Sequence, residues 1–374
     1  MNPTDDEQPP RQTPQGDTSR TGEPEENFPS TSSAGSESSS EPSPALAPAP
    51  AVPGPAPTGE TPSRAPRVRR RLHQGDALLA ATLRLQPRDR ALTMLLDEHR
   101  TLTTTQIAAI LYPSYATSRR RLYTLRTADW LDRFTVILPN RRSDTHWVLG
   151  PLGAHWAAGE EHRPPPTTKS ARDLRRAIAT SSHLAHTDGA NQFFIDLLTH
   201  ARHHPGTRLA RWFSPARTAA AAGQRIHPDG HGVWEQTDPT TGRTTQVGFY
   251  LEYDTGTETL ATLKNKLEPY RRLRQDGPNY PLLMWLPNPT REANLHRKLN
   301  GDATHLAITL ATTTPAAVTA HPEHLTGPVW KIAGNGRPRH RLIDLPSRHG
   351  NPHAPYHPGP PTPQQDPLYR LTTT

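Results

Sequence analysis

The strongest constraint on this chain is the alternating stretch Val247–Asp254, an apolar strand pattern whose last three residues include two acids. Successive side chains of a strand point to opposite faces, so the apolar residues at odd-numbered positions share one face while Glu252 and Asp254 share the other. Burying two carboxylates on one face is costly unless a cation meets them. Asp229, which follows a proline in an expected turn, is placed to complete an acidic cluster that suits a metal ion. The alternative interpretation is a solvated sheet face.

Composition divides the chain into an acidic, Pro-rich tail and a basic remainder. Of 374 residues, 43 are proline and only 32% are hydrophobic. Residues 1–65 carry ten acidic residues against three arginines, a net charge of −7, so an overall charge of +8 leaves +15 for residues 66–374. The tail cannot bury enough apolar surface to offset its chain entropy. The basic remainder favours a polyanion such as DNA as the partner.

Several classes of protein are excluded by what the sequence lacks. The chain has no cysteine, which rules out disulfides, thiolate metal sites and cysteine nucleophiles. No apolar run approaches the roughly 20 residues that span a bilayer, and the N-terminus has no signal-peptide pattern. We therefore expect a cytoplasmic protein, associated with the nucleoid or a plasmid and not with a membrane. His183 and His186 have a helical spacing that can chelate a metal, but helix capping or core hydrogen bonding is the favoured interpretation.

Residues 83–158 are predicted to form a winged helix-turn-helix DNA-binding domain. Helical spacing of apolar residues starts near Gln86, Thr103–Gln106 has a capping-box pattern, and a third helix is expected over residues 116–128. Two expected strands, 134–138 and 146–149, flank a basic hairpin tip. In this fold one helix lies in the major groove and the hairpin reaches the DNA backbone; the alternative is the same fold used for protein contacts. The expected DNA contacts are polar, aromatic and basic side chains of the third helix and the hairpin, namely Thr117, Ser118, Arg119, Arg120, Tyr123, Arg126, Arg141 and Arg142.

The remaining chain is predicted to contain one further folded domain. Residues 159–171, with three consecutive prolines, are expected to be a linker, and the order helix, three strands, helix, strand predicts an α/β domain over residues 172–313. A single helix is expected from Thr257 to Arg274, started by a capping box of Thr255 and Glu258. We expect residues 1–82 to be a disordered tail with a basic arm, and residues 314–374 to be irregular and mostly disordered.

Many short motifs occur in one order along the chain, among them Leu102–Ala108, Trp147–Pro151, Phe249–Glu258 and Lys266–Tyr270. In these motifs the chain resembles the replication-relaxation family of actinobacterial and plasmid proteins over about residues 83–300. The resemblance implies DNA binding linked to plasmid or mobile-element replication and DNA relaxation. It also implies replication or conjugation proteins as partners beside DNA.

The second domain is also similar to the restriction-endonuclease-like (PD-(D/E)xK) superfamily. That resemblance implies that Asp229 and Glu252 hold Mg²⁺, with a lysine two residues after the glutamate, where this chain has Asp254. Lys264 or Lys266 in the following helix is the candidate replacement, and surface charge on a helix is the alternative interpretation of both lysines. The candidate catalytic residues are therefore Asp229, Glu252, Asp254, Lys264 and Lys266.

The fold expected from both resemblances is an α+β multidomain protein, in which a winged helix-turn-helix is followed by an α/β restriction-endonuclease-like domain. Three functions stay open: a DNA-binding protein of the replication-relaxation type, a Mg²⁺-dependent DNA endonuclease (nickase), and a transcriptional regulator or replication scaffold without activity. Whether the protein is an enzyme is therefore open, and Mg²⁺ is expected only for the endonuclease.

Overall fold

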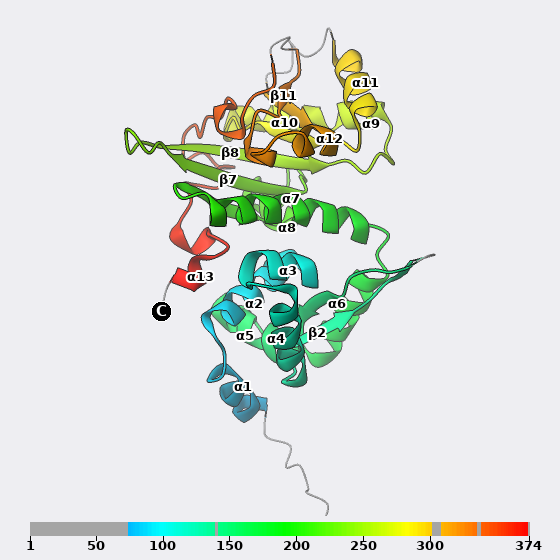
Figure 1. Cartoon of the computed structure of the whole chain (residues 1–374), viewed down its shortest axis with the longest axis vertical. Helices are drawn as coiled ribbons and strands as arrows, with labels where there is room; N and C mark the ends of the chain where they lie inside the picture. The colour runs from blue at the N-terminus through cyan, green and yellow to red at the C-terminus, as the bar shows by residue number, and fades with distance from the viewer. Residues whose placement is uncertain (1–73, 139–140, 301–307, 335–337, 373–374) are drawn as a thin grey trace, which may run out of the picture. The chain divides into compact units, whose positions relative to one another are not determined.

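The computed structural model describes residues 74–138, 141–300, 308–334 and 338–372 (Figure 1). The expected acidic tail up to residue 73, with its basic arm, lies outside these residues, as do the side chains of Arg141 and Arg142. The described chain mixes helices with antiparallel and mixed sheets. None of its helices is long and apolar enough to cross a membrane.

The N-terminal half of the described chain contains five helices and a small antiparallel sheet. Thr103 caps the third helix with the predicted capping box, since its side chain accepts from the backbone N–H of Gln106 and the Gln106 side chain accepts in return. The sheet has the order β1-β5-β2, and β3 pairs with β4 in a separate hairpin. The elements are α1 (Gln74–Thr82), α2 (Pro87–His99), β1 (Leu102–Thr103), α3 (Thr104–Leu111), α4 (Tyr115–Thr127), β2 (Leu131–Phe134), β3 (Ile137–Leu138), β4 (Arg141–Arg142), β5 (His146–Leu149) and α5 (Pro151–Glu160).

The C-terminal half is a six-stranded mixed sheet in the order β11-β10-β9-β8-β7-β6. Strands β6 to β8 form an antiparallel meander, whereas β8, β9 and β10 run parallel and are connected by helices. The elements up to the last parallel strand are α6 (Thr168–Ala179), α7 (Leu184–His203), β6 (Thr207–Phe213), α8 (Pro215–Ala221), β7 (Gly230–Thr237), β8 (Thr244–Tyr253), α9 (Leu260–Asn265), α10 (Leu267–Asp276), β9 (Leu282–Trp285), α11 (Pro289–Leu299) and β10 (Leu310–Thr313).

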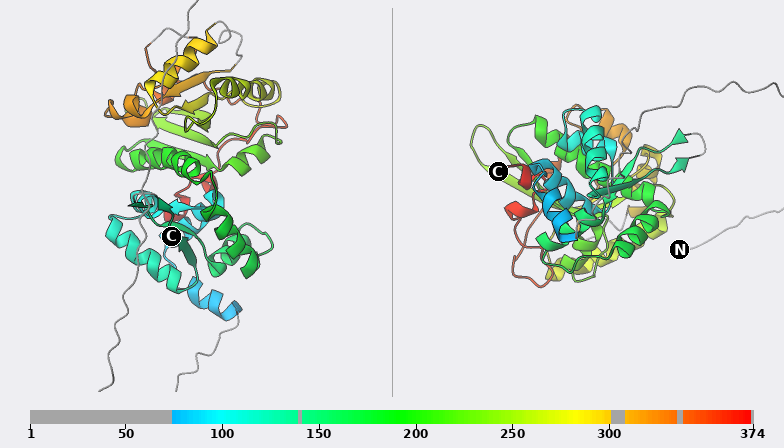
Figure 2. Two further views of the ribbon diagram at one scale, coloured as in Figure 1. Left: turned by 90° about the vertical axis from the view of Figure 1, so that its right-hand side faces the viewer. Right: turned by 90° about the horizontal axis from the view of Figure 1, so that it is seen from below.

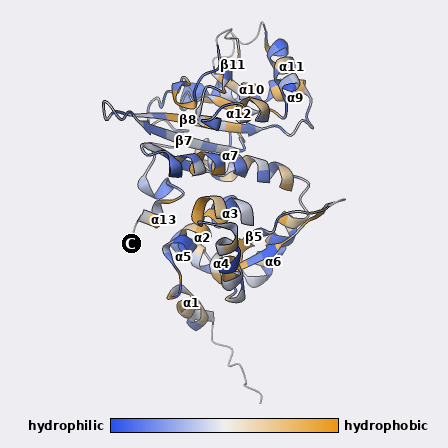
Figure 3. Ribbon diagram, viewed as in Figure 1, coloured by the Kyte–Doolittle hydropathy of each residue, from blue (hydrophilic) through white to orange (hydrophobic). Residues whose placement is uncertain are grey.

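Strand β8 separates two buried clusters, and this places the candidate site. Val247, Phe249 and Leu251 pack with α7 on one face, and Tyr250 packs with α9, α10 and α11 on the other. Figure 2 shows α7 lying between the sheet and the N-terminal helices. Helix α3, which is mainly hydrophobic in Figure 3, packs against both α4 and α7, so one core runs from the N-terminal helices into the sheet.

The single helix expected over residues 257–274 is wrong. The structure has two helices, α9 and α10, and Thr259 caps the first instead of Thr255. Pro269 explains the break, because it has no N–H to donate to the carbonyl of Asn265 and is tolerated only in the first turn of a new helix. Lys266 lies at the junction of the two helices, and its side chain reaches the end of β8, where Nζ lies 3.7 Å from Glu252.

The expectation of a mostly disordered C-terminal region is wrong for the described residues after position 313. β11 extends the sheet beside β10, and Trp330, Leu342 and Leu345 are buried in the cluster that includes α7. A few well-spaced apolar residues suffice to cover a sheet face. The Pro- and His-rich composition of this segment does not indicate that such residues are present. In the same way, part of the expected N-terminal tail forms α1. The C-terminal elements are α12 (Pro315–Thr319), η1 (His324–Thr326), β11 (Lys331–Ile332), η2 (Leu342–Asp344), η3 (Pro363–Gln365) and α13 (Tyr369–Thr372).

Candidate functional site

Helix α4 has a buried face that fixes it and an exposed face that is basic. Ser118, Leu122 and Leu125 are buried, at the i, i+4, i+7 spacing of one helix face. Arg119 and Arg120 are exposed, and neither forms an ion pair with any described residue. The helix therefore presents uncompensated positive charge to solvent.

The contacts of α4 divide the predicted DNA-binding residues into two groups. Thr117, Arg119 and Arg120 are exposed. Ser118 is fully buried, so the prediction that it points outward is wrong; its position one turn before Leu122 places it on the inner face. Tyr123 is half-buried, with its ring 5.6 Å from that of Trp147, and Arg126 lies 4.0 Å from Asp132.

Asp144 ties the start of α4 to the hairpin strand β5. One of its carboxylate oxygens accepts from the N–H (2.8 Å) and hydroxyl (2.7 Å) of Thr105 at the start of α3, and the other accepts from the N–H of Thr145 (2.7 Å) and the hydroxyl of Tyr115 (3.3 Å). Burial alone raises the pKa of Asp144, but these hydrogen bonds outweigh burial and hold the pKa below its ordinary value. A charged Asp144 therefore sets the angle between α3, α4 and the strand.

Helix α7 connects this N-terminal half to the sheet. Its Asp188 lies 2.8 Å from Nε2 of the buried His146 on β5, and the Asp188 carbonyl accepts from the Gln106 side chain at 3.0 Å. Its Asn191 donates to the carbonyl of Thr101 at 3.1 Å. These polar contacts fix α7 against β1, α3 and β5.

A second group of candidate side chains gathers at the C-terminal end of β8, beside the start of β7, in a cavity of about 550 Å³. Asp229, just before β7, accepts from the N–H of Tyr253 at 2.7 Å and lies 3.2 Å from Nε2 of His186 on α7. Glu252 on β8 accepts from the Tyr270 hydroxyl at 2.5 Å and lies 3.7 Å from Nζ of Lys266.

The electrostatics of this cavity follow from two carboxylates placed close together. Burial, and next the charge of Asp229, raise the pKa of Glu252 to about 7. The hydrogen bond to Asp229 raises the pKa of His186 above its ordinary value. Burial lowers the pKa of Lys266, but the pair with Glu258, 2.8 Å away, and the charge of Glu252 outweigh burial and raise it. Asp229 thus lies beside His186, and Glu252 beside Lys266, so each carboxylate has a basic side chain of the cavity next to it.

Four of the five candidate catalytic residues line the cavity, namely Asp229, Glu252, Asp254 and Lys266. The carboxylate of Asp254 is paired with Arg291 of α11 and accepts from the N–H of Gly256 at 2.8 Å. Asp254 thus joins β8 to α11. Lys264 is half-buried on α9 and is not among the described residues that line the cavity.

The side chains that hold this site are mostly ones the sequence pattern does not reveal. The spacing of His186 predicts only a metal ligand, a helix cap or a core hydrogen bond, because its partner Asp229 is 43 positions further along the chain. Tyr270 belongs to the apolar stripe of its helix, so its hydroxyl contact with Glu252 was not expected. Both contacts depend on where α7 and α10 cross the end of β8.

The cavity offers carboxylate oxygens, the donors that Mg²⁺, the ion of the predicted nuclease, prefers. Within the described residues, no group of three or more His, Asp or Glu side chains is arranged to hold a metal ion. Mg²⁺ commonly takes only one or two carboxylates and keeps several waters. Asp229 and Glu252 fit that smaller donor set, since a cation relieves the repulsion that contributes to the raised pKa of Glu252.

Comparison with known proteins gives one match. A family model described as replication-relaxation matches residues 93–282, just over half of the chain, and this range contains α4 as well as the cavity residues from His186 to Lys266. The search of curated proteins and the search of solved structures found no match.

Proposed function

The chain belongs to the replication-relaxation family, and from this premise we propose that it binds double-stranded DNA through a winged helix-turn-helix formed by α2 to α5 and strands β1 to β5. Family membership supports a role in replication or relaxation. We further propose that this DNA belongs to a plasmid or mobile element, and that the chain also binds replication or conjugation proteins.

The observation that carries this proposal is the exposed basic face of α4. A major groove about 12 Å wide admits one α-helix, and arginine is the side chain that most often pairs with guanine edges there. Arg119 and Arg120 are exposed and lack ion pairs within the described part of the chain, so binding DNA breaks no existing ion pair; Arg119 lies over the ring of Tyr123, 5.7 Å from its centroid. The anchored face of α4 and the Asp144 contacts hold these arginines in a fixed orientation.

The test is a fluorescence-anisotropy titration of labelled duplex DNA with the double variant Arg119→Ala/Arg120→Ala. Each lost base or phosphate contact costs about 1–3 kcal/mol, so we expect affinity to fall about 30-fold or more. The matched control is Arg271→Ala/Arg272→Ala, which removes the same charge from α10, where both arginines pair with Glu268. Equal affinities of the two double variants would contradict the proposal.

A second candidate function, a Mg²⁺-dependent DNA nickase, is favoured by the position of Lys266. The chain order is α7, β6, α8, β7, β8, α9, α10 and β9, which differs from the predicted helix, three strands, helix, strand by the helix α8 between the first two strands and by the division of the second helix in two. Asp229 and Glu252 would hold the ion, which lowers the pKa of a bound water and neutralises charge on the phosphate. Lys266, 3.7 Å from Glu252, would supply the amine that position 254 lacks.

Nicking of supercoiled plasmid in Mg²⁺ or Mn²⁺ tests this candidate. We expect nicking by the wild type, and its loss in Asp229→Asn, Glu252→Gln and Lys266→Ala. Glu268→Gln is the control, because Glu268 is a surface carboxylate paired only with arginines of its own helix. Absence of nicking by the wild type would contradict the nickase candidate. Nicking that persists in Asp229→Asn would show that this cavity is not its active site.

A further inference from the structure

Helix α6 is amphipathic, yet it buries none of its residues. Lys169, Arg172 and Arg176 follow the i, i+3, i+7 spacing of one helix face and are exposed. None of the three forms an ion pair with a described residue. α6 therefore presents three cations without ion pairs, which we name the α6 stripe, and one exposed carboxylate, Asp173, lies on the same face and leaves it net positive.

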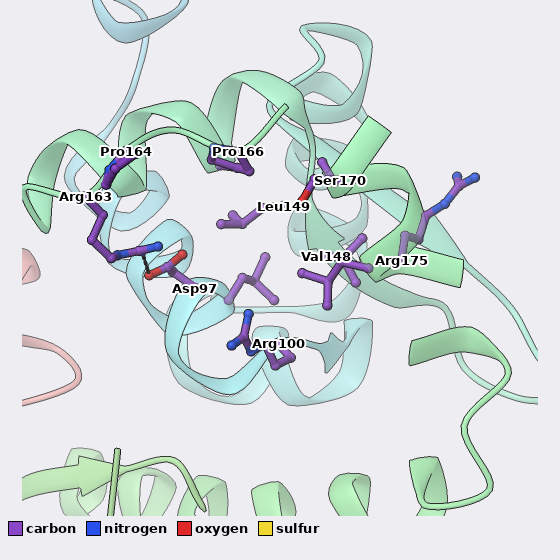
Figure 4. A pocket seen from close by; sticks show the side chains of 13 residues that line it. Asp97, Arg100, Val148, Leu149, Arg163, Pro164, Pro166, Ser170 and Arg175 are labelled. Carbon is purple, nitrogen blue, oxygen red and sulfur yellow. Dashed lines mark hydrogen bonds and ion pairs between the residues drawn. The ribbon is translucent and has the colours of Figure 1, made fainter. Parts of the chain in front are cut away.

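The opposite side of α6 faces the protein. Ala171 and Leu174 line a cavity of about 200 Å³ between the end of α2, strand β5 and the segment before α6 (Figure 4). Figure 4 also shows Arg163 joined to Asp97 across the rim, where Arg100 is a further lining residue. The apolar side of the helix borders this cavity with Leu174 still 44% exposed, and the α6 stripe lies on the other side of the helix.

A shared carboxylate places α6 beside the DNA-binding helix. Asp132 on β2 lies 2.7 Å from Nη1 of Arg175 on α6 and 4.0 Å from Nε of Arg126 on α4. Arg175 extends away from the cavity in Figure 4. The basic face of α4 therefore continues, across one bridging carboxylate, onto α6.

We propose that the α6 stripe is a second DNA contact that binds the phosphate backbone next to the site of α4; this inference rests on the proposed DNA binding. The stripe spans seven residues of helix, about 10 Å at a rise of about 1.5 Å per residue. One strand of B-DNA carries a phosphate about every 3.4 Å of its axis, so about three phosphates lie over the same length. The three cations therefore match the charge spacing of one strand.

A basic amphipathic helix also suits the surface of an anionic membrane. A helix bound there must turn its apolar stripe toward the lipid. Ala171 and Leu174 of α6 instead border the cavity against α2 and β5, where Leu174 is 44% exposed. The orientation of the helix favours DNA phosphates, which need only its polar side.

The test compares the salt dependence of DNA binding for the wild type and for Lys169→Gln/Arg172→Gln/Arg176→Gln. Each lost phosphate contact reduces the slope of log K against log salt by about 0.9, so we expect the slope to become shallower by about 2 to 3. Because phosphates carry no sequence information, affinity for a preferred and for a random duplex should fall by the same factor. The charge-conserving variant Arg172→Lys/Arg176→Lys should keep the wild-type slope.

The matched control is Lys298→Gln/Arg243→Gln/Arg274→Gln, which removes one lysine and two arginines from exposed positions of the C-terminal half. An unchanged slope in the α6 variant, with intact wild-type binding, overturns this inference alone. No DNA binding by the wild type overturns the proposed function as well. A third outcome is that the wild type cosediments with phosphatidylserine vesicles and the α6 variant does not, while the salt dependence of DNA binding is unchanged. This result assigns the stripe to membranes and also overturns the inference.

Discussion

At the scale of single residues, His99 connects the two halves of the molecule and must stay neutral to do so. Its ring stacks on Trp212 of β6, with the ring centroids 3.6 Å apart, and only 5% of the residue is exposed. Burial, and next the charge of Arg217, lower the pKa of His99 to about 3. Protonation of this side chain therefore opposes the folded state.

We expect His99 to cause part of the acid sensitivity of the fold. Its unfolded pKa is 6.5 and its folded pKa is about 3, so its contribution to stability is complete above pH 6.5 and is lost as pH falls through this window. The loss approaches about 1.4 kcal/mol per pH unit. His99→Phe keeps a stacked ring but cannot titrate, so urea unfolding between pH 7.5 and 5 should show a smaller loss for the variant. The same loss in both proteins would contradict this role.

Residue patterns predicted part of the candidate site. Asp229 and Glu252 were chosen from strand alternation and a turn, and the structure places both in one cavity. The roles of Asp254 and His186 could not be predicted, because Asp254 pairs with a residue 37 positions away and His186 with one 43 positions away. Such pairs depend on how helices cross the sheet, which no local spacing encodes.

At the scale of elements, the close approach of α7 to β8 determines the shape of the acidic cavity. A Cβ at Gly189 would overlap the ring of Tyr253, so only glycine permits this approach. The backbone N–H of Tyr253 donates to Asp229, and its ring packs edge-on against His186. The distance between α7 and β8 thus determines where these site residues lie.

Gly189→Ala should destabilise the protein although alanine favours helix. The propensity gain of up to about 1 kcal/mol is outweighed by overpacking, which costs about 1–3 kcal/mol in a packed core. Gly159→Ala on α5 is the control, because a Cβ there meets no atom within 4 Å. Thermal unfolding should show a lower Tm for Gly189→Ala and an equal or higher Tm for Gly159→Ala. A Tm for Gly189→Ala at or above that of the wild type would contradict the close packing.

The long regular elements were predicted from periodicity and caps, whereas breaks and short segments were not. The Thr103–Gln106 capping box is present as predicted. The break at Lys266 was missed because Pro269 falls inside a good apolar stripe. Strand β11 has only two residues, and no periodicity can be read from so short a segment.

At the scale of the whole molecule, the C-terminal segment closes the fold around a buried arginine. Arg211 of β6 is fully buried, and its guanidinium donates to the Gln365 side chain and to the carbonyls of residues 358–360. Burial lowers the pKa of Arg211 to about 10. Its charge is compensated by neutral acceptors from more than 140 positions further along the chain. Composition could not reveal that a Pro-rich end supplies those acceptors.

Removing one acceptor should therefore weaken the fold. Gln365→Ala leaves Nε of Arg211 without its acceptor, whereas Nη2 keeps the carbonyls of Pro358 and Pro360, and an unsatisfied buried donor on a charged group costs about 1–3 kcal/mol or more. Gln364→Ala, at the exposed neighbouring position, is the control. Chemical denaturation should show the loss for Gln365→Ala only. Equal stability of the two variants would show that the C-terminal segment is not needed to hold Arg211.

DNA contact by α4 is tested most directly by photo-cross-linking from single positions. A photo-reactive amino acid at Thr117, on the exposed face of α4, should form a covalent adduct with duplex DNA on irradiation. The same group at Arg272, exposed on α10, should form none. Competition with unlabelled duplex should abolish the adduct from position 117. Cross-linking from position 272 but not from position 117 would contradict DNA binding through α4.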